Sequence, residues 1–227
     1  MTYVISDLNG DYDKYIKMKD KILLKKRDDL FLLGNIIGYG QGGIDILTDA
    51  MEAENIFPMA GVDELNAICC LRALNRIDTS KENMKKIGEW MKTEAGEKTA
   101  TALSKMDKED REYLLDYLAE EFTLVEELSV GGRDFILANN GLGNFSKNKS
   151  IDDYTPDELT YGDFDIEGDY FDDKIIVCGS TPTHILGDEY DGKIYHGNNV
   201  ICLNTDVIEN RPMACIRLDD LKEYYVD

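Results

Sequence analysis

Apolar runs alternate with amphipathic stretches through the first third of the chain. The runs have the length of buried strands and end in glycine, asparagine or aspartate; they lie at 3–6, 30–33 and 57–60. Each run is followed by apolar residues at helical spacing, which predict three helices. The first begins at a cap, Asp11 or Asp13, and ends at about residue 21, and the others span about 44–53 and 64–75. Three repeats of strand, loop and helix predict an α/β fold with a largely parallel sheet.

The rest of the chain divides into a helical part and a strand-rich part. Residues 79–127 have helical character, and Leu114, Leu115 and Leu118 form an apolar stripe. The strongest strand patterns after them are at 135–138, 175–178, 200–203 and 213–218. No internal repeat and no linker divides the chain, so we expect a single domain over 1–227 with a helical insert at about 79–127.

Two short signals refine the strand-rich part. Gly131-Gly132 predicts a hairpin turn before the strand at 135–138. Thr155-Pro156 predicts the start of a short helix, with proline at its first position.

The chain is strongly acidic. It carries 46 acids and 25 bases, for a formal net charge of −21, which opposes binding to nucleic acid or to an anionic membrane. The segment 152–173 alone holds ten acids, no base and five aromatic residues. In one interpretation its rings tuck under a solvated loop; in the other the segment binds a basic partner.

Cysteine usage and the N-terminal residues bear on the cellular compartment. The five cysteines form no C-x-x-C pair, and Cys178, Cys202 and Cys215 lie in apolar runs that predict core positions. The first residues contain no basic region, and no run approaches the roughly 18 apolar residues that a membrane span needs. We therefore expect a cytoplasmic protein without a membrane segment.

Polar residues follow the predicted strands. Asp7, Asn35 and Asp63 come directly after the three strands of the first third. In sheets with parallel strands, sites form beyond the carboxyl ends of the strands. We therefore expect these side chains to meet.

Five short blocks at such strand ends resemble, in order, the signature blocks of calcineurin-type metallophosphatases. The family blocks read G-D-x-H-G, G-D-x-x-D-R-G, G-N-H-E, H-A-G and G-H-T-P-T. Here they read Ser6-Asp7-Leu8-Asn9-Gly10, Gly34-Asn35-Ile36-Ile37-Gly38-Tyr39-Gly40, Gly61-Val62-Asp63-Glu64, Asn139-Asn140-Gly141 and Gly179-Ser180-Thr181-Pro182-Thr183. Residues 214–220 are also similar to the last strand of the bacterial and phage serine/threonine phosphatases. The resemblance spans 3–220 and implies a four-layer αββα sandwich of two mixed sheets.

The family's reaction uses two divalent cations, such as Mn, Fe or Zn, that clamp the phosphate and activate water. The resemblance carries six metal-ligand positions over to this chain, and only Asp7 keeps the family residue. The other five positions hold Asn9, Asn35, Val62, Asn139 and Ser180. Amides, a hydroxyl and a valine are poor ligands for such cations, so we expect no metal cofactor.

The family's catalytic positions are changed as well. The histidine that protonates the leaving group is Asp63 here, its aspartate partner is Gly38, and the arginine that grips phosphate is Tyr39. A phenol cannot replace the bidentate guanidinium. We therefore expect no functional catalytic residue.

The altered pocket still holds a polar cluster, for which two interpretations stay open. The side chains hydrogen-bond one another and fill the old metal cavity. Alternatively, Asp7, Asn9, Asn35 and Asn139 hold a single hard cation, Ca²⁺ or Mg²⁺. His184, one residue after Thr-Pro-Thr, is expected to have a hydrogen-bonding or surface role, and His196 to be exposed in a hairpin.

These observations favour a pseudophosphatase, a binding or regulatory module whose basic partner contacts 152–173. A second hypothesis is a metal-dependent phosphoesterase with a remodelled site and weak activity, in which Asp7 and Asp63 act as acid and base. A third is a structural subunit that stabilises a catalytic homologue.

Overall fold

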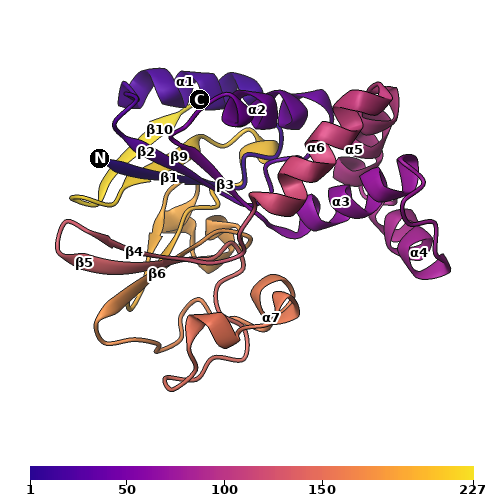
Figure 1. Ribbon diagram of the computed structural model, residues 1–227. Coiled ribbons are helices and arrows are strands. Elements are labelled where there is room, and N and C mark those ends of the chain that lie inside the picture. The colour runs from indigo at the N-terminus through magenta and orange to yellow at the C-terminus, as the bar shows by residue number, and fades with distance from the viewer.

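The computed structural model describes all residues 1–227, which form two β-sheets with helices outside them (Figure 1). The first sheet has the strand order β10-β9-β1-β2-β3, in which β1, β2 and β3 are parallel and β9 and β10 are antiparallel. Its strands are β1 (Thr2–Ser6), β2 (Asp29–Leu33), β3 (Ile56–Met59), β9 (Met213–Arg217) and β10 (Lys222–Val226).

The second sheet has the order β4-β5-β6-β8-β7, with β5, β6 and β8 parallel and an antiparallel strand at each edge. Its strands are β4 (Glu126–Val130), β5 (Arg133–Leu137), β6 (Lys174–Cys178), β7 (Tyr195–His196) and β8 (Val200–Cys202). Gly131 and Gly132 form the β4–β5 turn with φ of 60° and 77°, as the sequence predicts. His196 is exposed in the β7–β8 hairpin, also as expected.

The helices cover the first sheet and extend to one side of it. In Figure 1, α1 and α2 lie across the first sheet, and α3, α4, α5 and α6 gather beside it. The helices are α1 (Tyr12–Ile22), α2 (Gln41–Met51), α3 (Val62–Leu74), α4 (Lys81–Trp90), α5 (Glu94–Lys105), α6 (Lys108–Glu120) and the short α7 (Pro156–Thr160). None of them is long and apolar enough to cross a membrane.

The start of α2 corrects the sequence prediction. The helix begins at Gln41, so Gly42 and Gly43 form its first turn rather than a preceding loop. A Cβ added at Gly42 would overlap the carbonyl of Gly10, and one added at Gly43 would press on the backbone of Ile37. These glycines therefore let the helix approach the loops after β1 and β2, and packing outweighs their low helix propensity.

Three cores hold the layers together. Val4, Leu33 and Val177 belong to the core between the two sheets, and Tyr15 and Leu115 to the core between the first sheet and its helices. The third core lies outside the second sheet, where loops and α7 supply the side chains. The architecture is thus α/β with two mixed sheets, as predicted, and its fourth layer is built mainly of loops.

The buried cysteines and the aromatic rings of 152–173 contribute to these cores. Cys178, Cys202 and Cys215 are at most 1% exposed, as predicted. Tyr154 and Tyr170 are buried in the third core. Tyr161, in contrast, is 62% exposed.

Candidate functional site

The candidate site lies where parallel strands of both sheets end. Asp7 follows β1, Asn35 follows β2 after one glycine, Asn139 follows β5, and Ser180 follows β6. Asp7, Asn35 and Ser180 all have left-handed backbones, with φ of 50°, 49° and 58°. This conformation is uncommon for residues other than glycine. Here it turns the backbone sharply after each strand, so that these three residues lie close together.

The carboxylate of Asp7 is the centre of the cluster. Its Oδ1 accepts from Asn35 Nδ2 at 2.9 Å, and its Oδ2 accepts from the backbone N–H of Ser180 at 2.9 Å and from the Ser6 hydroxyl. Asn139 Nδ2 lies 3.5 Å from the same Oδ2. The side chain is fully buried, and this burial raises the pKa of Asp7 to about 6 in spite of the donors.

The amide orientations in this cluster follow from fixed backbone acceptors. Asn139 Nδ2 donates to the carbonyl of Leu33 at 2.7 Å, so Asn139 Oδ1 faces Asn35 and accepts from its Nδ2 at 3.2 Å. Asn9 Nδ2 likewise donates to the carbonyl of Asp7 at 2.8 Å. Since carbonyls only accept, each of these amides turns its NH₂ group inward.

The strands around the cluster are closely packed. A Cβ added at Gly179 would overlap Ser6 Oγ and Asp7 Oδ2, and one added at Gly34 would lie 2.7 Å from Asn139 Cβ. Close packing and mutual hydrogen bonds thus give each oxygen of the Asp7 carboxylate at least one donor within the cluster. The sequence predicted that Asp7, Asn35 and Asp63 meet. The structure brings Asp7, Asn35, Asn139 and Ser180 together, whereas Asp63 reaches Asn35 only through its backbone N–H at 3.4 Å and accepts with its carboxylate from Trp90.

A second buried carboxylate, Glu64, lies beside this cluster. Its Oε1 accepts from the backbone N–H groups of Ile36 and Ile37, and its Oε2 accepts from those of Asn35 and Gly61, all at 2.7–2.9 Å. Glu64 thereby fixes the loop after β2 against the start of α3. The sequence analysis placed this glutamate in a family block without recognising this role, although its position at the third residue of α3 is the one that reaches back to a helix cap.

The three residues at positions that resemble the family's catalytic residues have different surroundings. Asp63 accepts from Trp90 Nε1 of α4 at 2.9 Å, and burial raises its pKa while that hydrogen bond opposes the shift. Gly38 lies against Asn9, so close that a Cβ there would be 3.1 Å from Asn9 Cα. Tyr39 has a left-handed φ of 57° and lies beneath Lys98 Nζ, 5.6 Å from the ring centroid. Val62 is the first residue of α3 and offers no polar atom.

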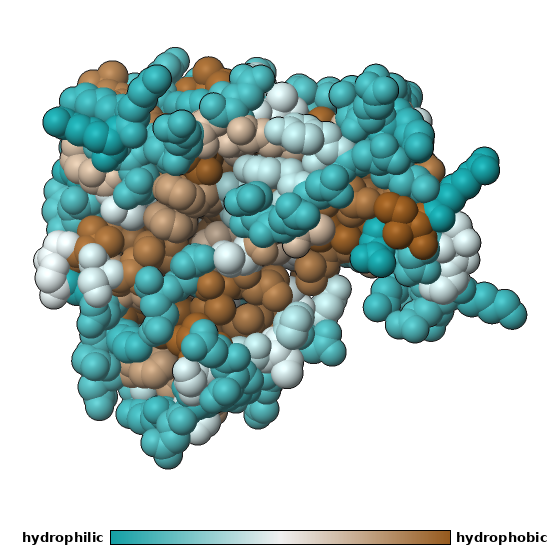
Figure 2. All heavy atoms as spheres, viewed as in Figure 1, coloured by the Kyte–Doolittle hydropathy of each residue, from teal (hydrophilic) through white to brown (hydrophobic).

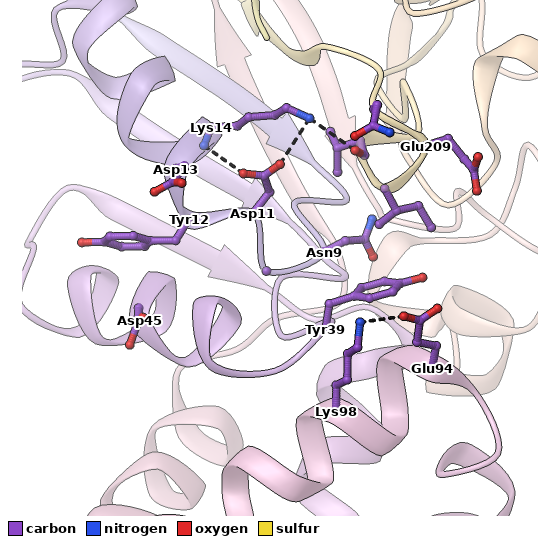
Figure 3. Close-up of a pocket in the computed structure, with 14 residues that line it drawn as sticks. Asn9, Asp11, Tyr12, Asp13, Lys14, Tyr39, Asp45, Glu94, Lys98 and Glu209 are labelled. Carbon is purple, nitrogen blue, oxygen red and sulfur yellow. Dashed lines mark hydrogen bonds and ion pairs between the residues drawn. The ribbon is translucent and has the colours of Figure 1, made fainter.

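A cleft of about 660 Å³ opens beside Asn9 and Tyr39 (Figure 3). Its lysines are already engaged: Lys14 pairs with Asp11 at 3.2 Å and Lys98 pairs with Glu94 at 2.6 Å. The cleft's carboxylates, which outnumber its lysines, are Asp11, Asp13, Asp45, Glu94 and Glu209. The cleft is therefore negative and has no free cation for a phosphate.

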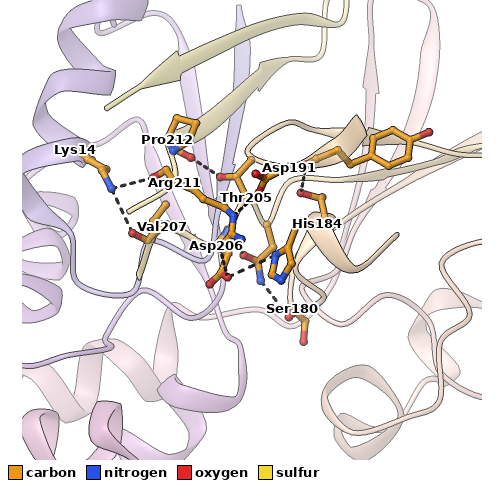
Figure 4. A network of polar contacts seen from close by, with 12 residues as sticks. Lys14, Ser180, His184, Asp191, Thr205, Asp206, Val207, Arg211 and Pro212 are labelled. Carbon is orange, nitrogen blue, oxygen red and sulfur yellow. Dashed lines mark hydrogen bonds and ion pairs between the residues drawn. The ribbon is translucent and has the colours of Figure 1, made fainter. Parts of the chain in front are cut away.

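His184 belongs to a separate polar network next to Ser180 (Figure 4). Its Nδ1 lies 3.6 Å from Asp206 Oδ2, which also accepts from Arg211 Nη1 at 2.9 Å. Arg211 Nε donates to Asp191 at 2.6 Å. The half-buried histidine thus borders the site beside two carboxylates and one arginine. No pattern in the sequence points to Asp206 or Arg211, because neither lies in one of the five site blocks.

No protein-family model matches the sequence, and no curated protein matches it. Solved structures do resemble it over nearly its whole length. The structure of a "putative diadenosine tetraphosphatase" has a TM-score of 0.65 at 11% identity and covers 99% of this chain and 92% of that one. A protein serine/threonine phosphatase from Saccharomyces cerevisiae with similarity to human phosphatase PP5 has a TM-score of 0.55 at 10% identity, covering 99% and 78%. A metallophosphoesterase from Sphaerobacter thermophilus has a TM-score of 0.51 at 14% identity, covering 100% and 88%. At these identities the likeness establishes the fold, which is that of metallophosphoesterases.

The fold implies divalent cations, and the residues present do not fit a two-cation centre. Both oxygens of Asp7 are occupied by donors, and the amides of Asn35 and Asn139 present N–H groups where a cation would need oxygen lone pairs. No three residues among the histidines, cysteines and acids are grouped closely enough to hold a metal ion. A single hard cation at Asp7, Asn9, Asn35 and Asn139 would require Asn9 and Asn139 to leave their backbone acceptors and Asn35 to turn its NH₂ group away from Asp7.

Proposed function

We propose that this chain is a catalytically inactive or severely impaired protein of the metallophosphatase fold that serves as a binding or regulatory module. The observation that carries the proposal is the closed hydrogen-bond network around Asp7. The two carboxylate oxygens of Asp7 accept from Ser6, Asn35 and Ser180, so a cation bound there would have to displace these donors. Without cations, the chemistry of this fold has neither activated water nor a phosphate clamp.

The charge of the adjoining cleft supports the same proposal. Its five carboxylates repel an anionic phosphate ester, while Lys14 and Lys98 are held in ion pairs. Tyr39 offers no positive charge at the family's arginine position. Arg211, the guanidinium of the neighbouring network, is committed to Asp191 and Asp206.

The proposed partner is a basic protein, because a chain of net charge −21 attracts one at long range. Segment 152–173 is the first contact that we propose. Its buried rings leave mainly carboxylates and Tyr161 at the surface. A contact there would draw chiefly on charge and would weaken with added salt.

Hydrolysis of p-nitrophenyl phosphate with added Mn²⁺, at high protein concentration, tests the proposal. We expect a rate equal to that of buffer, while an active metallophosphatase in the same buffer turns over. The variants Asp7→Ala and Asp13→Ala separate the chain's own activity from contamination, because both lose a carboxylate but only Asp7 lies in the cluster. A metal-dependent rate that Asp7→Ala abolishes and Asp13→Ala preserves would establish the weak phosphoesterase instead.

A further inference from the structure

A mostly apolar groove of about 600 Å³ lies along the edge strand β3 of the first sheet. Its walls come from the end of α2, from β3 and from α6. Its aromatic residues are Phe31, Phe57, Tyr113 and Tyr117. Figure 2 shows pale and brown residues gathered on this face of the molecule between teal ones.

Two of these rings are exposed to solvent in an ordered arrangement. Phe57 is 40% exposed and stacks on Phe31 with the ring centroids 5.1 Å apart, and Tyr113 is 65% exposed on α6. Large exposed rings that rest on a packed core are suited to anchor a partner, because they lose little conformational freedom on binding. The groove therefore offers preformed apolar contacts.

The backbone of β3 disfavours strand addition as the mode of contact. The carbonyl of Asn55 accepts from the N–H of Leu30 in β2, whereas the N–H of Ala60 donates to the carbonyl of Thr123 on the opposite side. Since backbone groups alternate sides along a strand, the N–H and C=O groups of the even-numbered residues of β3 point away from β2. Pro58 is one of these and has no N–H to offer. A partner is therefore held by its side chains rather than by a ladder of backbone hydrogen bonds.

The charge around the groove selects the partner. Glu54, Glu121 and Glu126 line it, none of them forms an ion pair, and no lysine or arginine lies among the lining residues. A second copy of this chain would bring the same net charge of −21 and be repelled. Apolar anchors beside unpaired carboxylates complement a segment that carries both bulky apolar and basic side chains.

We propose that this groove is a docking site for a peptide segment of a partner protein in which bulky apolar residues are flanked by lysine or arginine. This proposal specifies how a partner would be bound, and it rests on the proposed function as a binding module. Peptide binding is measured apart from phosphate ester hydrolysis, so either proposal can fail without the other.

A displayed library of random peptides of about twelve residues, which reach roughly 40 Å when extended, is the probe. It is selected on the full chain and counter-selected on Tyr113→Ser. We expect enriched sequences with at least two bulky apolar residues and a lysine or arginine. No enrichment, or enrichment without basic residues, would overturn the proposal.

Fluorescence anisotropy with an enriched peptide then locates the contact. Tyr113→Ser removes an exposed ring and should weaken binding about tenfold or more, and Glu121→Lys should weaken it by about threefold to tenfold. The matched controls Ile185→Ser and Glu189→Lys change an equally exposed apolar side chain and an unpaired, exposed acid outside both the groove and segment 152–173. They should leave affinity within about twofold.

Loss of binding in Tyr161→Ser and Glu167→Lys, with retention in the groove variants, would place the contact on segment 152–173 and overturn the groove. Sedimentation gives a further check on the occupant. A dimer at micromolar concentration that Tyr113→Ser dissociates would mean that a second copy fills the groove, which also overturns the proposal.

Discussion

Asp7 and Glu64 are both buried carboxylates beside strand ends of the first sheet, but their hydrogen-bond donors come from different parts of the chain. Glu64 accepts four backbone N–H groups from the loop after β2 and the start of α3. Asp7 accepts chiefly from side chains, those of Ser6, Asn35 and Asn139, with one N–H from Ser180.

The source of the donors decides whether a carboxylate's surroundings depend on the residue types around it. Backbone donors exist whatever the side chains are, so Glu64 can hold the same loops whether or not the site is catalytic. Side-chain donors depend on residue type, so the surroundings of Asp7 change when asparagine or serine stands at a metal-ligand position. In this chain the loops at the strand ends are thus held by backbone donors to Glu64, around a centre whose side chains hydrogen-bond one another.

The largest effect is expected for Glu64→Gln. At pH 8 the new amide keeps one oxygen for two donors and turns its NH₂ group toward the other two buried N–H groups. We expect a loss on the order of 3 kcal/mol in the free energy of unfolding, measured by urea denaturation. The exposed Glu167→Gln should change it by less than about 0.5 kcal/mol. Equal stabilities would contradict the architectural role of Glu64.

Asn35→Asp is expected to have the next largest effect. It places a second carboxylate where Asn35 Nδ2 now lies, 2.9 Å from Asp7 Oδ1. Two such carboxylates cannot both ionise without a cation, so they share a proton and resist losing it. Unfolding at pH 8 should become easier by roughly 2 kcal/mol, and at pH 5 the loss should be smaller.

The exposed Asn148→Asp adds the same charge and should show no such pH dependence. Added Mn²⁺ tests whether the Asn35→Asp variant binds a cation, because a cation that binds the native state stabilises it by mass action. A melting temperature that stays unchanged with Mn²⁺ in Asn35→Asp is expected, since Asn9, Val62, Asn139 and Ser180 still lack the family's ligands. A large rise would mean that one residue alone keeps cations out.

Asp7→Asn is distinguished by its pH dependence. Its new NH₂ group also faces hydrogen-bond donors and lowers stability at every pH, as in Glu64→Gln. The folded pKa of Asp7 is raised from 3.8 to about 6 by burial. The contribution of Asp7 to the free energy of unfolding is therefore fully present below about pH 4 and is lost as the pH rises toward 6. Relative to the parent chain, the variant should gain on the order of 3 kcal/mol between pH 4 and 7. Parallel stability curves for the two chains would show that Asp7 titrates normally.

Much of the fold could be predicted from local patterns. The strands β1, β2, β6 and β9 fall within a residue or two of their predicted bounds, because fully buried strands read as continuous apolar runs. β10 was not predicted, since its residues Lys222–Val226 are mostly half-buried and their pattern is mixed. The start of α2 was placed late because glycine propensity was weighed without the close approach of two loops.

The candidate site could be predicted as a set of positions but not as a set of contacts. The strand-end motifs placed Asp7, Asn35, Asn139 and Ser180 together. Trp90, which binds Asp63, comes from a helix 27 residues further along, and no pattern connects the two. The groove beside β3 draws residues from 31 to 126, and its apolar character is invisible in any single segment.

The sequence by itself determined which residue types stand at the strand ends, because strand and helix periodicity is set by backbone geometry over a few residues. It thereby determined that, at the six positions resembling the family's metal ligands, one carboxylate stands beside three amides, a hydroxyl and a valine. Only the tertiary structure decided that the Leu33 carbonyl orients Asn139, and through it Asn35, toward Asp7. Which acceptor meets which donor depends on strand order and sheet packing, which bring together residues more than a hundred positions apart.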